Sequence, residues 1–492
     1  MNKKNDLTGE KRLPSVLMTA AECAPFIKTG GLADVVGTLS RKLHSLGFDV
    51  RLMLPYHRAI KDRLKDKAEH KKSFGIELGW RTQYAGIEEY DWDGLTVYFI
   101  DNEYYFGHAV YCGGTFEGEQ YAYFSRAVIE SQPLIGFEPD IIHVNDWHTA
   151  MVPMLLKTQY VQCLQGKPST VLSIHNIGFQ GRFDFGFVAD MLGIDPRYNA
   201  PEYFELFGSV NFLKGGIVFA DKIVTVSPSY AQEIRTPYFG EGLDGVLRAR
   251  ADDLIGILNG IDTDAYDPAA DPHIAQPYDA GTFTLKQKNK EALMLELGLK
   301  ISKKTPLLSV VSRLSRQKGI DLILRVFGDI MSEDVCFVLL GTGDHDYENF
   351  FSDAQERWNK RVRSLIKFDE ALAHRIYAAS DFLLMPSQFE PCGLAQMIAL
   401  RYGTLPIVRE TGGLKDTVFA YNADTGKGNG FTFANYNAHE MLGSVRDALR
   451  VYRQKEALSA LIKNAMAQDL SFDKSAHEYA ALYLEDHGGT QS

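Results

Sequence analysis

Short apolar runs rich in Val, Ile and Leu alternate along this chain with stretches whose apolar positions recur at helical spacing. Runs of this length between amphipathic helices are typical of buried parallel strands in an α/β fold. The predicted strands are Ser15–Ala21, Val97–Asp101, Asp140–Asn145, Thr170–His175 and Lys222–Ser227 in the first half, and Leu254–Leu258, Leu307–Ser312, Val335–Leu340, Asp381–Pro386 and Leu405–Val408 in the second.

Helical periodicity is clearest over Leu32–Leu46, Gln120–Leu134 and Gly319–Met331. The pattern breaks after Asn259-Gly260-Ile261-Asp262, where a segment with three prolines indicates an irregular linker. We therefore predict two doubly wound, Rossmann-like domains that face a cleft, which suits a chain of 492 residues. The predicted boundaries are 1–260 for the first domain, 261–281 for the linker and 282–473 for the second domain.

Composition narrows the class of protein further. A net charge of −11 argues against a general nucleic-acid binder, and the lack of a long uninterrupted apolar run argues against a membrane span. The polar start MNKKNDLTGEKR has no apolar core, so we expect no secretory signal and a short mobile lead-in. The five cysteines are scattered and form no CxxC pair, which indicates a cytoplasmic protein without a disulfide framework or cysteine-rich zinc site: Cys23, Cys112, Cys163, Cys336 and Cys392.

One motif occurs twice. Thr29-Gly-Gly-Leu-Ala-Asp-Val-Val and Thr411-Gly-Gly-Leu-Lys-Asp-Thr-Val match at six of eight positions, and each follows a predicted strand. A Gly-Gly pair at a helix start lets backbone N–H groups approach an anion. Lys28 before the first copy adds a positive charge beside Gly30 and Gly31, whereas Glu410 precedes the second.

Polar residues also crowd the ends of two strands in the first half. Asn145 and Asp146 follow one strand, and we expect one of them to cap the next helix and the other to contact a ligand. His175 and Asn176 follow another strand and precede a glycine loop, which favours a hydrogen bond from His175 to a ligand.

The second half places two cations, Arg313 and Lys318, around a turn that follows a strand. Such a pair suits a diphosphate, whose charge must be neutralised as it leaves. Gly341 after the next strand is a weaker signal of the same kind.

The segment Ser387–Gln396 follows another predicted strand. Pro391 suits a first helical turn, which would leave the N–H groups of Cys392, Gly393 and Leu394 available to an anion. Glu390 would then contact a sugar hydroxyl. Cys392 invites a nucleophile assignment, but no His is near it in sequence and packing is the preferred interpretation.

Together these segments resemble bacterial glycogen synthases and plant starch synthases that use ADP-glucose. The matching signatures are Lys28-Thr-Gly-Gly-Leu-Ala-Asp-Val, Asp146-Trp-His, His175-Asn-Ile-Gly-Phe-Gln-Gly, Ser312-Arg-Leu-Ser-Arg-Gln-Lys-Gly, Glu390-Pro-Cys-Gly-Leu-Ala-Gln and the run from Tyr402 to Val418. They occur in order and at family-like spacing.

The resemblance implies a GT-B glycosyltransferase whose C-terminal helix, here about 474–492, returns to the first domain. It implies transfer of glucose from ADP-glucose to the non-reducing end of glycogen or a malto-oligosaccharide, with retention and without a metal or cofactor. The implied catalytic residues are Asp146, His175, Arg313, Lys318 and Glu390. The implied substrate-binding residues are Lys28, Gly30, Gly31, Asn176, Gly341, Cys392, Gly393, Leu394 and Glu410.

Three alternatives stay open at this point. The same fold could use UDP-glucose or a sucrose-type acceptor. It could be a non-catalytic glucan-binding protein, although a pure binder needs no pair of cations at Arg313 and Lys318. A glucan phosphorylase shares the general fold, but it needs a pyridoxal phosphate lysine and a much longer chain.

Overall fold

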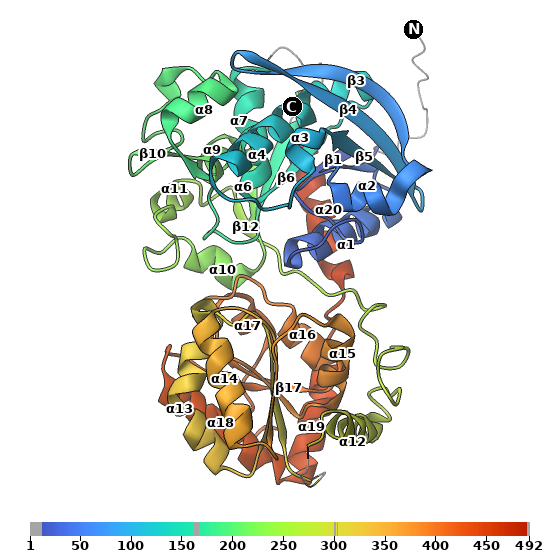
Figure 1. Ribbon diagram of the computed structural model, residues 1–492, viewed down its shortest axis with the longest axis vertical. Coiled ribbons are helices and arrows are strands. Elements are labelled where there is room, and N and C mark those ends of the chain that lie inside the picture. The colour runs from blue at the N-terminus through green and yellow to red at the C-terminus, as the bar shows by residue number, and fades with distance from the viewer. Residues whose placement is uncertain (1–11, 162–166, 300–301, 303, 490–492) are drawn as a thin grey trace. The chain divides into compact units, whose positions relative to one another are not determined.

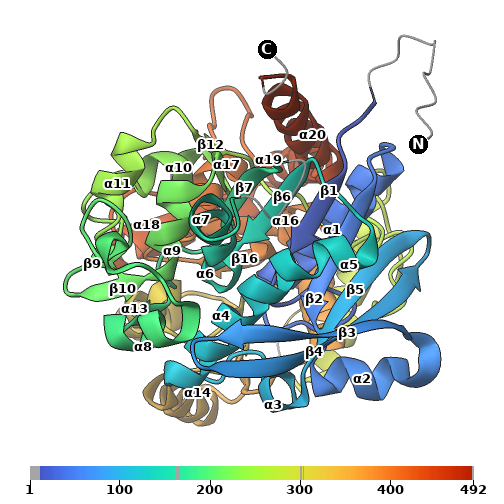
Figure 2. The same ribbon diagram turned by 90° about the horizontal axis from the view of Figure 1, so that it is seen from above.

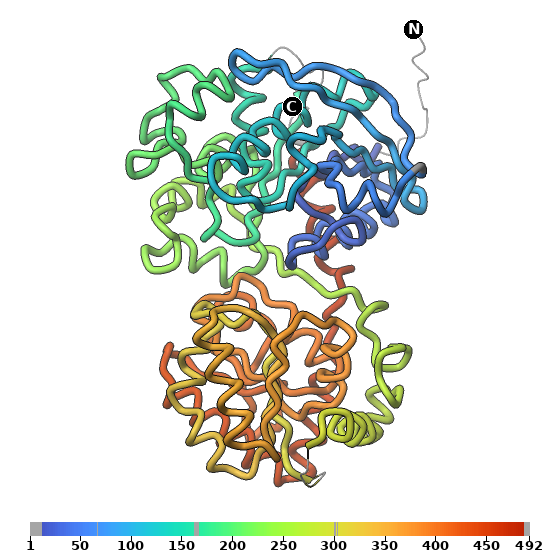
Figure 3. The backbone as a smooth tube through the Cα atoms, viewed as in Figure 1, coloured from blue at the N-terminus to red at the C-terminus, as the bar shows by residue number. Residues whose placement is uncertain are grey.

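The computed structural model describes residues 12–161, 167–299, 302 and 304–489, so the polar N-terminal lead-in and Cys163 lie outside the described residues. The chain divides into two compact units. Unit 1 contains the chain up to Thr225, then Ile234–Ile257 and the segment from Asp473 onward, and unit 2 contains Val226–Glu233 and Leu258–Phe472. Figure 3 lets the reader follow the chain as it passes from one unit to the other.

Unit 1 is built on a nine-stranded sheet with the order β12-β11-β7-β6-β1-β2-β5-β4-β3. The pairs from β12 to β5 are parallel, whereas the long β3–β4 hairpin pairs antiparallel with β5 and forms one edge of the sheet (Figure 2). The strands are β1 (Val16–Thr19), β2 (Val50–Pro55), β3 (Glu69–Leu78), β4 (Arg81–Trp92), β5 (Leu95–Asp101), β6 (Ile141–Asn145), β7 (Ser169–Ile174), β11 (Lys222–Thr225) and β12 (Leu254–Gly256).

The parallel strands of unit 1 are buried apolar runs, and helices cover them. The helices of unit 1 are α1 (Gly31–Ser45), α2 (Arg58–Leu64), α3 (Glu103–Phe106), α4 (Gly114–Glu130), α5 (Gln132–Ile135), α6 (Asp146–Thr149), α7 (Met151–Thr158), α8 (Phe185–Leu192), α9 (Phe212–Phe219), α11 (Asp244–Ala249) and α20 (Phe472–Gly489). A small antiparallel sheet adds β8 (Arg182–Phe183), β9 (Glu205–Leu206) and β10 (Ser209–Asn211).

Unit 2 is an all-parallel, six-stranded sheet with the order β15-β14-β13-β16-β17-β18. Figure 1 shows α13, α14 and α18 on one face of this sheet and α12, α15, α16 and α19 on the other. Its strands are β13 (Leu307–Val311), β14 (Cys336–Leu340), β15 (Val362–Leu365), β16 (Phe382–Met385), β17 (Leu405–Arg409) and β18 (Phe431–Phe433).

The helices of unit 2 pack through one apolar face. In α13, for example, Ile320, Ile323, Phe327 and Ile330 recur at three- and four-residue spacing and are all buried. The helices are α10 (Pro228–Glu233), α12 (Lys286–Glu296), α13 (Ile320–Ser332), α14 (His345–Arg357), α15 (Glu370–Ala379), α16 (Ala395–Arg401), α17 (Gly412–Thr417), α18 (Ala438–Tyr452) and α19 (Lys455–Met466).

The predicted fold class is confirmed, and each predicted strand corresponds to a strand of the structure. The helix predicted over Gln120–Leu134 is interrupted at Ser131, two residues before Pro133, so that α4 and α5 are separate helices. Strand β2, the β3–β4 hairpin, β15 and β18 were not predicted. No helix of the described residues is long and apolar enough to cross a membrane.

Candidate active site

Each sheet has one switch point, where neighbouring parallel strands lead to opposite sides of the sheet. In unit 1 it lies between β1 and β6, and in unit 2 between β13 and β16. Ligands of open α/β sheets bind beyond the carboxyl ends of strands at such points. Most of the candidate residues follow these strands, and His175 follows the adjacent β7. Together with Glu22 after β1, they form two groups, which we call the first cluster (Glu22, Asp146 and His175) and the second cluster (Arg313, Lys318 and Glu390).

Asp146 and His175 of the first cluster are joined by hydrogen bonds. The backbone N–H of His175 donates to Asp146 Oδ1 at 2.7 Å, and that of Asn176 donates to the same oxygen at 3.4 Å. Asp146 has a φ of +52°, a conformation that non-glycine residues rarely adopt and that is common at functional sites. Burial raises the pKa of Asp146 to about 7 against the effect of these two N–H groups, and the charge of Glu22 raises it further.

The imidazole of His175 is held in one orientation. Its Nε2 lies 2.9 Å from Asn145 Oδ1, while Asn145 Nδ2 donates to the carbonyl of Thr19 at 3.0 Å. This arrangement places the proton on Nε2 and leaves Nδ1 as an acceptor. Burial lowers the pKa of His175 to about 4, so the ring is neutral near pH 7.

Asn145 occupies the N-cap position of α6, as expected of Asn145 or Asp146, but without a side-chain capping bond. Its side chain holds His175 instead. The hydroxyl of Thr149 accepts the Asn145 N–H at 2.7 Å. The side chains of Asn145 and Asp146 therefore both form hydrogen bonds with His175.

The first Thr-Gly-Gly turn already contacts a carboxylate of the chain itself. Glu22 Oε2 accepts a hydrogen bond from the Thr29 hydroxyl at 2.7 Å and another from the Thr29 backbone N–H. Gly30 caps α1, and Gly31 is its first residue. Lys28 lies 2.9 Å from Asp34 Oδ1 with about a third of its side chain exposed, so its ammonium group remains accessible to solvent.

In the second cluster, Lys318 and Glu390 form an ion pair of 2.6 Å between Nζ and Oε2. The Ser387 hydroxyl donates to the same oxygen at 3.0 Å. Glu390 is buried, whereas Arg313 is exposed and its guanidinium has no partner among the described residues. The switch point of unit 2 therefore has a carboxylate and a cation that are paired with each other, Glu390 and Lys318, and an exposed cation, Arg313.

Glycines bring the loops of the second cluster together. A Cβ on Gly319, whose φ is +70°, would lie 2.0 Å from the carbonyl oxygen of Pro386, and a Cβ on Gly341 would lie 1.8 Å from that of Ser312. The Gln388 N–H donates to the carbonyl of Gln317 at 2.8 Å. Lys318 reaches Glu390 because only glycine allows these backbones to approach so closely.

The helix predicted to start at Pro391 begins four residues later. Helix α16 starts at Ala395, and Gly393 with a φ of +75° keeps the preceding segment out of helical geometry. The N–H groups of Cys392, Gly393 and Leu394 nevertheless donate to no acceptor among the described residues. They stay available to an anion as loop amides rather than as a helix terminus.

Two other expected residues have different surroundings. Burial raises the pKa of Cys392 to about 12, so the group is a thiol near pH 7, as expected for packing and not for a nucleophile. Glu410 is exposed and accepts a hydrogen bond from the Thr432 hydroxyl at 2.7 Å, so its carboxylate is directed toward β18 and not toward Lys318.

Three residues of unit 2 were not singled out from the sequence. Asn259 is buried, and its Oδ1 has no hydrogen-bond partner among the described residues. Phe368 follows β15, the neighbour of β14, after which Gly341 comes, and is 86% exposed. Glu233 accepts hydrogen bonds from the second Thr-Gly-Gly turn. An exposed aromatic residue after a strand is a usable sequence signal, but Asn259 and Glu233 carry none.

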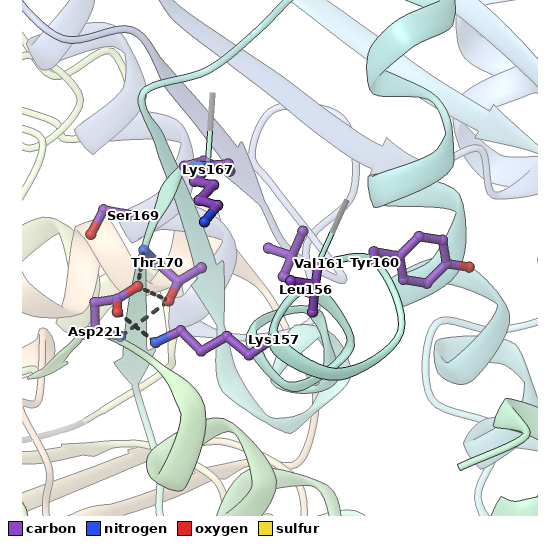
Figure 4. A pocket seen from close by; sticks show the side chains of 9 residues that line it. Leu156, Lys157, Tyr160, Val161, Lys167, Ser169, Thr170 and Asp221 are labelled. Carbon is purple, nitrogen blue, oxygen red and sulfur yellow. Dashed lines mark hydrogen bonds and ion pairs between the residues drawn. The ribbon is translucent and has the colours of Figure 1, made fainter. Parts of the chain in front are cut away.

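Among the described residues of unit 1, two of the pockets bear on the choice of site. One of about 430 Å³ adjoins the glycine loop after His175, and its lining residues are Glu117, Trp147, Gly178, Phe179, Gln180, Gly181, Arg182 and Glu241. The other, of about 320 Å³, lies at the amino end of β7, whereas His175 follows the carboxyl end (Figure 4). Its charged residue Asp221 is already bound by Lys157 and Thr170. Only the first pocket adjoins the candidate site.

Comparison with known proteins gives the family. Residues 15–249 match the starch synthase catalytic domain model, and residues 298–468 match the glycosyl transferases group 1 model. The glycogen synthase of Anoxybacillus flavithermus is 48% identical over 96% of this chain and 98% of its own length, and that of Geobacillus stearothermophilus is 50% identical over 95% and 97%. The chain belongs to the glycogen synthase family.

Solved structures agree with this family. The catalytic domain of starch synthase IV from Arabidopsis thaliana, bound to ADP and acarbose, superposes with a TM-score of 0.89 at 35% identity and covers 97% of this chain and 100% of its own. Sucrose-phosphate synthase from Thermosynechococcus elongatus, at 16% identity and a TM-score of 0.60 with the same coverage, shows the shared fold alone. The family's reaction is retaining transfer of glucose from ADP-glucose to an α-1,4-glucan, and the chain is a glycosyltransferase of this kind.

Proposed function

We propose that unit 2 binds ADP-glucose through the second cluster and that unit 1 binds the end of glycogen or a malto-oligosaccharide beside the first cluster. The observation that carries the proposal is the ion pair between Lys318 and Glu390 at the switch point of unit 2, with the exposed Arg313 on the neighbouring loop. This arrangement places two cations for a diphosphate next to a carboxylate for a sugar hydroxyl.

The cations act on the leaving group. As the bond between glucose and ADP breaks, negative charge grows on the diphosphate and positive charge on the sugar. Arg313 and Lys318 neutralise the diphosphate, and the loop N–H groups of Cys392, Gly393 and Leu394 add donors that need no rearrangement. Within unit 1, Lys28 and the turn at Gly30 and Gly31 offer a cation and the start of α1 to a phosphate group.

Glu390 binds a sugar hydroxyl. Its Oε2 is occupied by Lys318 and Ser387, so Oε1 is the oxygen that is left to accept from glucose. Gly341 and Glu410, which follow the flanking strands β14 and β17, border this position. The carboxylate is thereby oriented before the donor arrives, which lowers the entropic cost of binding.

The first cluster lies beside the end of the bound glucan in this proposal. His175 is neutral near pH 7, and its backbone and that of Asn176 are held by hydrogen bonds to Asp146. No pair of carboxylates at glycosidase spacing is required, because the departing phosphate itself helps to deprotonate the acceptor hydroxyl at the same face.

The pocket beside the glycine loop is the proposed acceptor site. Phe179, which is half exposed, offers an apolar face for a sugar ring beside the largely buried Trp147 of the pocket wall, and Glu117, Arg182 and Glu241 offer hydrogen bonds. Tyr104 and Tyr111 are exposed and could also stack on a sugar, whereas Tyr105 is fully buried, donates to Glu119 and packs in the core.

The donor's base contacts Phe368 in this proposal. A flat apolar ring that is almost fully exposed after β15, beside the strand that Gly341 follows, suits a stacked purine. We also propose a cytoplasmic location, supported by the free thiols of the four described cysteines.

Substitutions in the second cluster test the proposal. We expect Lys318→Ala and Glu390→Gln to lower kcat by at least about 100-fold, because each removes a charge that acts at the reacting centre. The control Arg446→Ala breaks the exposed ion pair with Glu333 in the same unit and keeps wild-type kcat. Thermal melting verifies folding, and near-normal turnover of either variant at saturating donor refutes its assigned role.

Cys392→Ser separates packing from nucleophilic catalysis. The variant keeps substantial activity, because a buried thiol with a raised pKa does no chemistry near pH 7. Complete inactivation with donor binding and folding intact would restore the nucleophile interpretation.

A further inference from the structure

The second Thr-Gly-Gly turn is held by a carboxylate from elsewhere in unit 2. Glu233 Oε1 accepts hydrogen bonds from the Gly412 N–H at 2.9 Å and the Thr411 hydroxyl at 3.0 Å, and Glu233 Oε2 lies 3.2 Å from the same hydroxyl. The start of α17 therefore has an anion already in place. Arg409 and Lys415 are the cations near Glu233.

That turn in turn holds the backbone of the Glu390 loop. The Gly413 N–H donates to the carbonyl oxygens of Glu390 and Pro391 at 3.1 and 3.2 Å. A Cβ on Gly412 would lie 2.0 Å from the Glu390 carbonyl oxygen, and one on Gly413 would lie 2.1 Å from that of Cys392. The two backbones are in direct contact, so a shift of the turn displaces the loop.

The other carbonyls of the loop are also bound. The Ser227 hydroxyl donates to Pro391 O at 2.7 Å, and Gln396 Nε2 donates to the carbonyls of Cys392 and Gly393 at 3.0 and 2.9 Å. Because these carbonyls are directed into unit 2, the N–H groups of the same peptides are left for a ligand. The position of the loop thus depends on the turn that Glu233 binds.

Glu233 lies at the end of a short excursion of the chain. Val226–Glu233 belongs to unit 2, although residues on both sides of it belong to unit 1. A second anchor fastens the same excursion to α17, since Ser229 donates through its N–H and hydroxyl to Asp416 at 2.8 and 2.6 Å. Among the described residues, neither side chain of this second anchor forms a hydrogen bond with the Thr-Gly-Gly turn or with the Glu390 loop.

We propose that Glu233 is a positioning residue for the transferase reaction, which fixes the Glu390 loop by binding the start of α17. The proposal rests on the role given above to Glu390. Glu233 contacts neither donor nor acceptor in this account. Its effect is on how well Glu390 and the loop N–H groups are placed when the donor is bound.

The test compares variants of the two anchors in the full-length chain. Glu233→Ala lowers kcat at least about 30-fold and changes KM for ADP-glucose by less than about 3-fold. Glu233→Gln keeps an oxygen for the Gly412 N–H and stays within about 3-fold of wild-type kcat. Ser229→Ala, the matched control, loosens the same excursion and leaves kcat within about 2-fold.

Two results overturn the proposal. One is a Glu233→Ala enzyme with kcat within about 3-fold of wild type, and the other is a loss in Ser229→Ala as large as in Glu233→Ala. If Glu233→Ala fails to fold, Thr411→Val is used in its place. This variant removes only the hydroxyl that donates to Glu233. A Thr411→Val enzyme with the kcat of the wild type would then overturn the proposal. Glu390→Gln, assayed in parallel, shows separately whether the role of Glu390 itself fails.

Discussion

At the scale of single residues, burial sets the protonation states of the first cluster. The pKa of Asp146 is raised to about 7, whereas burial lowers the pKa of His175 to about 4 and that of His143 to about 3. These shifts have opposite consequences for stability. The two histidines stabilise the fold less as pH falls below about 6.5, and Asp146 destabilises it as pH rises from about 4 to 7.

Asp146→Asn isolates the contribution of this carboxyl group. Between pH 4 and 7 native Asp146 holds a proton that the unfolded chain releases, so the wild type loses stability with rising pH through this group. The variant has no ionisable group at this position and therefore does not lose stability in this way. We expect its stability relative to wild type to increase by up to about 1.4 kcal/mol per pH unit in this window.

The measurement is urea unfolding of both proteins at several pH values from 4 to 8. A difference between variant and wild type that stays constant across the window contradicts the raised pKa. Activity is a second readout: we expect Asp146→Asn to retain donor binding and to lose turnover, because the acceptor of the His175 N–H is weakened.

At the scale of elements, most of the parallel strands could be predicted from the sequence, whereas the parallel strands β2, β15 and β18 and the β3–β4 hairpin could not. Continuous apolar runs such as Val335–Leu340 are buried on both faces of the sheet, and such runs can be recognised as strands from the sequence. Strands β3 and β4 have no continuous apolar run, because they form an edge hairpin with many exposed polar residues, and so they were not predicted. β15 and β18 are short, and their sequences do not differ from those of loops.

The candidate site was predictable to a similar extent. Residues directly after strands, such as His175 and Glu390, could be placed because parallel strands bring their carboxyl ends to one edge. The helix expected at Pro391 starts at Ala395, since contacts with Gly412 and Gly413 override the local helix signal. The contact between Glu233 and Gly412 joins positions 179 residues apart, and no local pattern reveals it.

Gly319→Ala tests how loop contacts bring Lys318 to Glu390. The variant needs a φ of +70° with a Cβ that meets the Pro386 carbonyl at 2.0 Å, so we expect a stability loss of more than about 1 kcal/mol and a kcat loss of at least about 10-fold. Gly328→Ala, within the following helix α13 and with nothing within 4 Å of its Cβ position, is the matched control. We expect it to raise stability by about 0.5–1 kcal/mol with unchanged kcat. Equal behaviour of the two variants contradicts the argument.

At the scale of the whole molecule, the C-terminal helix α20 belongs with unit 1, which otherwise comes from the chain up to Ile257. Tyr479 and Tyr483 on this helix are fully buried, and the Tyr483 hydroxyl lies 2.6 Å from His143 Nδ1. His143 Nε2 lies 2.7 Å from the Ser173 hydroxyl on β7. The end of the chain thus completes the core beneath the strands that carry Asp146 and His175.

Substitutions on α20 test this dependence. We expect Tyr483→Ala to lower the free energy of unfolding by about 3–5 kcal/mol through the cavity it leaves, and Tyr483→Phe by about 1–3 kcal/mol through the lost partner of His143. Leu484→Ala, at the exposed neighbouring position, changes it by less than about 0.5 kcal/mol. Thermal and urea unfolding provide the values, and a Tyr483→Ala protein as stable as Leu484→Ala refutes the account of α20.

The central claim is that the enzyme transfers glucose from ADP-glucose to glycogen. A comparison of two donors, each supplied separately, tests it most directly. Purified protein is given glycogen with either ADP-glucose or UDP-glucose labelled in the glucose, and label in the precipitated glucan is followed over time. We predict incorporation from ADP-glucose with a kcat/KM at least about 100-fold above that for UDP-glucose, and loss of that incorporation in Glu390→Gln. Glycogen binding without incorporation from ADP-glucose, or faster incorporation from UDP-glucose, would contradict the account.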